Sequence, residues 1–78
     1  MKLLVRNLAR TTTEHDIRKL FSEHGAVAEC TLVLDQETGL SKGFAFVEMP
    51  DVSEAESAIA ALHLTSVAKS KIRVKAAQ

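Results

Sequence analysis

The residues Lys42-Gly43-Phe44-Ala45-Phe46-Val47-Glu48-Met49 are the most informative part of this 78-residue sequence. Aromatic and small apolar side chains alternate through the middle of the segment and Pro50 follows it, so the pattern predicts a β-strand that ends before the proline. Successive side chains of a strand point to opposite faces of a sheet, so Phe44 and Phe46 share one face. Two of the three aromatic residues in the chain therefore lie together on one predicted strand.

A second strand precedes this one along the chain. Residues 27–34 are rich in β-forming side chains, and the polar segment 35–41 separates them from the Phe44 strand, which favours a β-hairpin. Thr31 and Val33 point to the same side of this strand. The other side carries Cys30, Leu32 and Leu34, and we expect Cys30 to be an unreactive packing residue.

Two helices are predicted, one before and one after the hairpin. Thr13 with Asp16, and Ser53 with Glu56, have the spacing of capping boxes, which satisfy the free N–H groups at the start of a helix. Gly25 is placed to end the first helix as its C′ residue. Apolar residues recur at helical spacing, and they are Ile17, Leu20 and Phe21 in the first helix and Ala55, Ala58, Ile59 and Leu62 in the second.

Short apolar-rich strands are predicted at residues 2–6 and 71–75, and the second of these alternates strictly. The order of the elements is then β-α-β-β-α-β. This is the order of the ferredoxin-like α+β fold, a four-stranded antiparallel sheet with two helices on one face. We expect residues 1–78 to form a single domain of this kind.

One face of such a sheet packs against the helices, and the other is left open. Strict alternation assigns to the helix side the residues Leu3, Val5, Val47, Ile72 and Val74. The side chains predicted for the open face, and hence for ligand binding, are Leu4, Arg6, Thr31, Val33, Lys42, Phe44, Phe46, Glu48, Lys71, Arg73 and Lys75.

The predicted open face combines two aromatic rings with lysine and arginine side chains. Burying an aromatic ring normally stabilises a domain by about 1.5–3 kcal/mol, so a short chain that leaves two rings outside its core points to a ligand. Aromatic side chains stack unpaired bases at about 1–3 kcal/mol per base, and cations meet the phosphates. The pattern predicts a module that binds single-stranded RNA, with single-stranded DNA as a second ligand of the same chemistry.

The segment 42–49 also resembles the ribonucleoprotein motif of the RNA recognition motif (RRM) family, Lys/Arg-Gly-Phe/Tyr-Gly/Ala-Phe-Val-x-Phe/Tyr, at six of its seven specified positions. Residues 3–8 resemble the companion hexamer, in which Leu4 replaces the usual aromatic residue. The resemblance covers essentially the whole chain and extends to small stand-alone bacterial members. It implies that Phe46 stacks a base, that Phe44 packs against sugars or a second base, and that Lys42 pairs with a phosphate.

Leu4 leaves a second hypothesis open. Together with Val33, Phe44 and Phe46 it would form an apolar patch, and exposed apolar patches often mark protein interfaces. The same face could therefore bind another protein, or a second copy of the chain as a weak homodimer. The cations could also be only a solvated surface. A one-residue shift of register would instead turn both rings into the core, but it would expose Val47.

Composition and spacing exclude several other functions. Lysine plus arginine equals aspartate plus glutamate at ten each, so long-range attraction to nucleic acid is weak. One cysteine forms neither an internal disulfide nor a zinc site, so we expect no metal and no cofactor. An acylphosphatase-like enzyme of this fold would need a loop that closes around a phosphate, and the loop 7–12 has no glycine for this. No Ser/His/Asp or Cys/His/Asn set can be assigned either, so we expect no enzyme. No signal peptide or membrane span is evident, which favours a cytoplasmic protein.

Overall fold

The computed structural model describes residues 1–77. Its elements follow one another as β1 Lys2–Arg6, α1 Glu14–Ser22, β2 Glu29–Leu34, β3 Ser41–Glu48, α2 Val52–Leu62, β4 Ser66–Val67, β5 Ser70–Lys71 and β6 Arg73–Ala76. The predicted β-α-β-β-α-β order is present, with a short hairpin of β4 and β5 before the last strand. Within the described part of the chain, no helix has the length and apolar character needed to cross a membrane.

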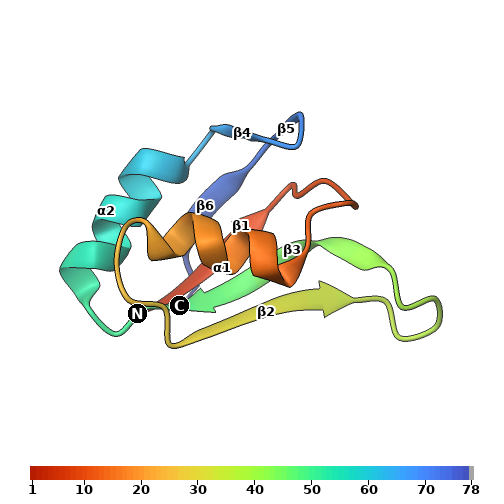
Figure 1. The fold of residues 1–78 in the computed structure, drawn as a ribbon, viewed down its shortest axis with the longest axis horizontal. Helices are drawn as coiled ribbons and strands as arrows, with labels where there is room; N and C mark the ends of the chain where they lie inside the picture. Colours follow the sequence, from red (N-terminus) through yellow and green to blue (C-terminus); the bar gives the residue numbers. More distant parts are fainter. Residues whose placement is uncertain (78) are drawn as a thin grey trace.

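The main sheet is antiparallel and has the strand order β2-β3-β1-β6. Leu4 of β1 lies opposite Phe46 of β3 on one side and opposite Lys75 of β6 on the other. Both helices cover the same face of this sheet (Figure 1). The arrangement confirms the predicted ferredoxin-like α+β fold.

The core lies between that face and the helices. The residues assigned to the helix side by alternation are at most 2% exposed, and they are Leu3, Val5, Val47, Ile72 and Val74. They form one cluster with the buried helix residues Ile17, Phe21, Ala55, Ala58 and Leu62. Val47 is fully buried while its neighbour Phe46 is only half-buried, so the shifted register does not occur.

The start of α1 is the capping box that the sequence predicts. The Thr13 hydroxyl accepts a hydrogen bond from the Asp16 N–H at 3.1 Å, and the Asp16 carboxylate accepts one from the Thr13 N–H at 3.0 Å. The hydrogen bond from the Thr13 backbone, followed by that from its side chain, lowers the pKa of Asp16. An ionised carboxylate is also favoured at the positive end of the helix.

The prediction that Gly25 is the C′ residue of α1 is wrong. The helix ends at Ser22 with Glu23 as its C-cap, so Gly25 lies in the loop that follows. A Cβ at position 25 would come within 2.5 Å of Glu54 Oε1, and glycine is needed for that close approach. Glu54 Oε1 also accepts a hydrogen bond from the Ala26 N–H at 3.1 Å, which ties this loop to α2.

The predicted cap of α2 is also wrong. Asp51, not Ser53, is the N-cap, and its Oδ1 accepts a hydrogen bond from the Glu54 N–H at 3.0 Å. Aspartate caps a helix as well as serine does, and Asp51 already has the extended backbone that an N-cap requires. The helix therefore begins at Val52, and Ser53 lies within its first turn.

The last predicted strand, 71–75, is divided in the structure. Ser70–Lys71 forms β5 and pairs with β4, whereas the strand of the main sheet begins at Arg73. The turn between β4 and β5 is made by Ala68 and Lys69, whose φ angles are 51° and 69°. Two consecutive positive φ angles are typical of a type I′ hairpin turn, which usually contains asparagine or glycine. The sequence therefore carried no signal for this hairpin.

The end of α2 supports the edge of the main sheet. His63 is the C-cap of α2, and its Nδ1 accepts a hydrogen bond from the Val74 N–H at 3.1 Å. β6 is an edge strand, whose N–H groups point alternately toward and away from β1, and that of Val74 is directed away from β1 to His63. His63 thus supplies a partner for a backbone group that the sheet itself does not satisfy.

The β2–β3 hairpin contains the polar turn that the sequence predicts. Asp35 Oδ1 accepts hydrogen bonds from the N–H groups of Glu37 at 2.8 Å and Thr38 at 3.0 Å. These backbone donors, that of Thr38 first, lower the pKa of Asp35. The hairpin projects past the start of α1 (Figure 1), and Leu34 near its tip is 49% exposed rather than packed under the helices.

The pairing of β2 with β3 shifts near this tip. Leu32 lies opposite Ala45, but Leu34 lies opposite Ser41, so β3 contains extra residues at the bulge. Gly43 lies within this stretch with a φ of 84°, a conformation that L-residues rarely adopt. The bulge falls where the sequence predicts ligand-binding side chains, and bulges are common beside functional sites.

Candidate nucleic-acid interface

The open face of the sheet is the surface opposite the helices. Its middle row takes one residue from each strand, because Thr31 lies opposite Phe46, Phe46 opposite Leu4, and Leu4 opposite Lys75. Leu4 therefore lies between an aromatic ring and a lysine at the centre of the sheet. This row shows that the predicted residues of four separate segments meet on one surface.

The two aromatic rings of β3 contact each other on this face. The ring centroids of Phe44 and Phe46 are 6.2 Å apart and the ring planes make an angle of 87°, an edge-to-face arrangement. Both residues are half-buried. Each ring thus contacts the other while part of its surface stays accessible to solvent.

A cavity of about 260 Å³ adjoins Phe44 at one end of the sheet, and its lining includes Arg6, Arg10 and Lys42. Arg10 Nη1 donates a hydrogen bond to the Ser41 carbonyl at 2.7 Å. A Cβ at Gly43 would lie 3.3 Å from the Leu8 carbonyl oxygen, a tight contact with backbone, and the φ of 84° at this position also favours glycine. Arg10 is not among the residues predicted for this face, because its place depends on the conformation of the loop after β1.

A second cavity of about 290 Å³ adjoins Phe46, and it is lined by Lys2, Glu29, Thr31, Phe46 and Glu48. Lys2 Nζ lies 4.9 Å from the centroid of the Phe46 ring, a cation–π contact. Lys2 and Glu29 are also not among the residues predicted for this face. The alternation that places Leu4 and Thr31 on this face also places them there, so the signal was present.

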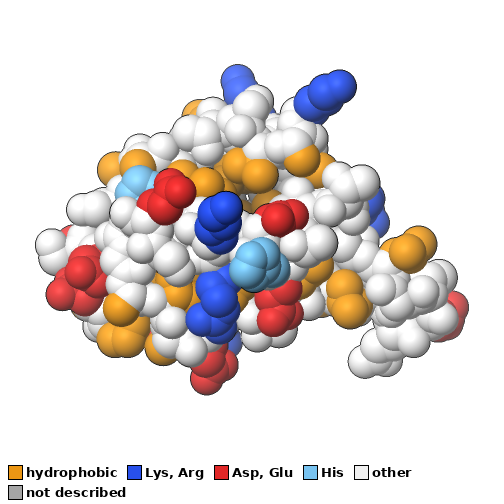
Figure 2. Space-filling view, in the orientation of Figure 1, with side chains coloured by type: hydrophobic (Ala, Val, Ile, Leu, Met, Phe, Trp, Pro, Cys, Tyr) orange, Lys and Arg blue, Asp and Glu red, His pale blue; other side chains and the backbone are white. Residues whose placement is uncertain are grey.

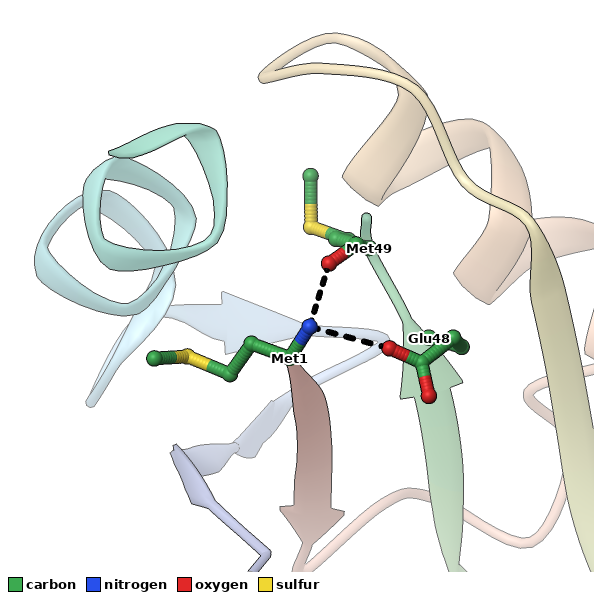
Figure 3. A network of polar contacts seen from close by, with 3 residues as sticks. All are labelled: Met1, Glu48 and Met49. Atoms are coloured by element: carbon green, nitrogen blue, oxygen red, sulfur yellow. Dashed lines mark hydrogen bonds and ion pairs between the residues drawn. The ribbon is translucent and has the colours of Figure 1, made fainter. Parts of the chain in front are cut away.

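Glu48 already has a partner within the domain. Figure 3 shows the α-amino group of Met1 between two acceptors, 3.0 Å from Glu48 Oε2 and 2.7 Å from the Met49 carbonyl oxygen. One carboxylate oxygen of Glu48 is thus occupied by a positive charge. Glu48 also lines the cavity beside Phe46.

The structure brings together nearly all of the side chains predicted for the open face. Lys71 is an exception, because it belongs to β5 and lies outside the four-stranded sheet. Val33 is half-buried at the register shift of β2 and lines neither of the two cavities. The residues that share the face by register or cavity are Leu4, Arg6, Thr31, Lys42, Phe44, Phe46, Glu48, Arg73 and Lys75.

The family model of the RNA recognition motif matches residues 3–73. The chain belongs to the RNA recognition motif family. Among curated proteins, this RRM is 48% identical over 63 residues to the flowering time control protein FCA of Oryza sativa subsp. indica, covering 81% of this chain and 8% of that protein. It is 44% identical over 62 residues to the putative RNA-binding protein RbpE of Nostoc sp., covering 80% of this chain and 63% of that protein.

The RRM chain therefore spans only part of the length of these curated relatives. The similarity to RbpE confirms the resemblance to small bacterial members of the family. Among solved structures, the crystal structure of RNA binding protein PG1 matches with a TM-score of 0.96 and 39% identity, covering 99% of this chain and 93% of that chain.

Proposed function

We propose that this RRM binds single-stranded RNA on the open face, as one module formed by residues 1–78 and without catalysis. The observation that carries the proposal is the Phe44–Phe46 pair, two half-buried rings in edge-to-face contact on a surface that the helices do not cover. Stacking on such rings needs an unpaired base, because the bases of a duplex already stack on one another. The names of RbpE and PG1, both RNA-binding proteins, support the same ligand.

The roles that we assign to the two rings are those that the resemblance to the family implies. Phe46 lies in the middle row beside Leu4 and stacks a base, while Phe44 packs against the sugars or a second base. Leu4 offers an aliphatic surface without a π-face, so we expect fewer stacked bases than in a fully aromatic RRM. Single-stranded DNA has the same bases and phosphates and is a second ligand of this surface.

The cationic side chains meet the phosphates. Arg6 lies directly opposite Arg73, and like charges placed opposite each other on neighbouring strands repel. Lys42 and Arg10 lie with Arg6 around the cavity beside Phe44. A phosphate bound here relieves the repulsion and replaces it with attraction. The cytoplasmic location stays a prediction from the sequence.

One observation favours a second candidate, a protein partner or a weak homodimer on the same face. Leu4 is aliphatic at the centre of the sheet, where an apolar partner would gain from contact with it. The surrounding cations favour the RNA proposal over this candidate, since they suit phosphates better than an apolar surface.

A titration of the ¹⁵N-labelled domain with a pool of short RNAs, followed by NMR, tests the proposal. We expect shifts confined to residues 2–6, 29–31, 42–48 and 73–76, and a log K against log salt slope of roughly −2 to −3.5 if three to five cations meet phosphates. Phe46→Ala should weaken binding by about 1–3 kcal/mol. The same titration with a DNA pool compares the two ligands.

Two outcomes would contradict the RNA proposal. One is the absence of salt-sensitive binding to the pool, and the other is unchanged affinity after Phe46→Ala in a variant whose spectrum shows a folded domain. Shifts of the open face that depend on protein concentration, without RNA, would instead support the homodimer.

A further inference from the structure

The cavity beside Phe46 has a chemical character that differs from the rest of the open face. Arginine and lysine surround the cavity beside Phe44, whereas the Phe46 cavity is lined by two carboxylates, one ammonium group and one hydroxyl. Carboxylates repel phosphates, so the backbone of a bound strand is directed away from this cavity. A base that stacks on Phe46 is the part of the ligand that enters it.

The carboxylates are held by the register of the sheet. Glu29 of β2 lies directly opposite Glu48 of β3, and Glu48 lies opposite Lys2 of β1. Glu48 is paired with the Met1 amino group, whereas the Glu29 carboxylate makes no hydrogen bond or ion pair within residues 1–77. Two like charges opposite each other destabilise the sheet, and a ligand that donates hydrogen bonds to them relieves that repulsion.

The edges of the four bases differ in what they offer to these groups. Ionised carboxylates accept hydrogen bonds only, and lysine donates them only. Guanine presents two adjacent donors, N1–H and the N2 amino group, beside the acceptor O6. Uracil presents two carbonyl acceptors on either side of a single donor, and a carboxylate repels both. Adenine and cytosine each place a ring acceptor next to their amino group.

We propose that the cavity lined by Lys2, Glu29 and Glu48 selects guanine for the base stacked on Phe46. The Glu29 carboxylate accepts the two hydrogen bonds of the guanine N1–H and N2 amino group, and Lys2 donates to O6. Lys2 Nζ now lies 4.9 Å from the Phe46 centroid, and its flexible stem allows it to move from the ring to the base edge. The cavity of about 290 Å³ is near the lower limit of small-ligand sites, about 300 Å³, which suits one base.

This inference rests on the proposed function, and five-nucleotide uridine RNAs with one central substitution separate the two. We expect the RNA with a central guanosine to bind about tenfold or more tightly than the all-uridine RNA, the discrimination of a good paired contact. A central inosine keeps N1–H and O6 but lacks the N2 amino group, so it should lose several-fold of that preference. Central adenosine and cytidine should lie below guanosine.

Glu29→Gln removes the charge at nearly constant shape and should bring the guanosine-to-uridine ratio close to one. Glu56→Gln makes the same charge change at an exposed position of α2 and should leave the ratio unchanged. Equal affinities for all central bases, or a ratio that survives Glu29→Gln, would overturn the guanine inference and leave the RNA proposal standing. Failure of every RNA to bind would overturn both.

Discussion

The two faces of the main sheet are made by the same four strands, yet their side chains differ in how deeply they are buried. Leu3 and Val47 on the helix side have no exposed surface, whereas their neighbours Leu4 and Phe46 on the open face are half-buried. Acidic and basic side chains are intermixed over the helix side (Figure 2). The two faces thus differ in how much apolar surface they leave accessible, a difference that the net charge of the chain does not reveal.

The largest expected effect compares adjacent residues of β1. Leu3→Ala removes a fully buried side chain and should lower the free energy of unfolding by about 2–5 kcal/mol. Leu4→Ala should cost less than about half of this, because Leu4 keeps part of its surface in water. Urea denaturation of both variants measures the difference. Equal losses would show that the two faces contribute equally to stability.

Leu4→Phe sharpens the comparison by adding a third ring to the open face. It should tighten RNA binding by up to about 1–3 kcal/mol, the contribution of one base–aromatic stack. Fluorescence anisotropy with a labelled RNA measures the affinity, and the thermal midpoint shows whether the domain is intact. Unchanged affinity in a stable variant would place the bound strand away from the middle row.

Cys30 and Thr31 are adjacent residues of β2 that allow the accessibility of the two faces to be compared. Cys30 is 5% exposed, and burial, followed by the charge of Glu14, raises the pKa of its thiol. Its reaction with a thiol reagent should therefore be at least about tenfold slower than that of Cys30→Ala/Thr31→Cys, which carries an exposed thiol at the next position. Similar rates under native conditions would mean that the helix side opens readily.

The salt dependence of RNA binding distinguishes the contribution of lysines on the open face from that of lysines on the helix side. Lys42→Gln should weaken binding of all RNA sequences alike and reduce the magnitude of the log K against log salt slope by about 1. Lys19→Gln changes an exposed lysine of α1 on the helix side and should leave the slope unaltered. Equal effects of the two variants would indicate attraction by overall charge and not by contact.

The smallest effect concerns acid stability on the helix side. The pKa of Asp16 is lower in the folded state than its ordinary value of 3.8, so the unfolded chain binds this proton more readily. The carboxylate therefore stabilises the fold above that value, and its contribution is lost as the pH falls through its lowered pKa. Asp16→Asn should lose less stability than the parent between pH 7 and pH 3, measured by urea midpoints.

Alternation and helical spacing were sufficient to predict the fold, the core strands and the central row of the open face. These patterns did not predict the β4–β5 turn, the place of Arg10 and the N-cap of α2, where the backbone conformation decides which residues are used. Ala68 and Lys69 form a tight turn without the residues typical of one, and Arg10 is placed by a loop. Asp51 and not Ser53 is the cap of α2, because both residue types satisfy the same requirement and the backbone is extended at Asp51.

The hydrogen bond from Val74 to His63 bears on how copies of this domain meet one another. An edge strand with unpaired N–H groups is a template on which another chain can add a strand, and this is a route to aggregation. The imidazole of His63 occupies one such group on β6. The sheet edge formed by β6 therefore offers one backbone donor fewer to an added strand, and a side chain from the end of α2 lies against it.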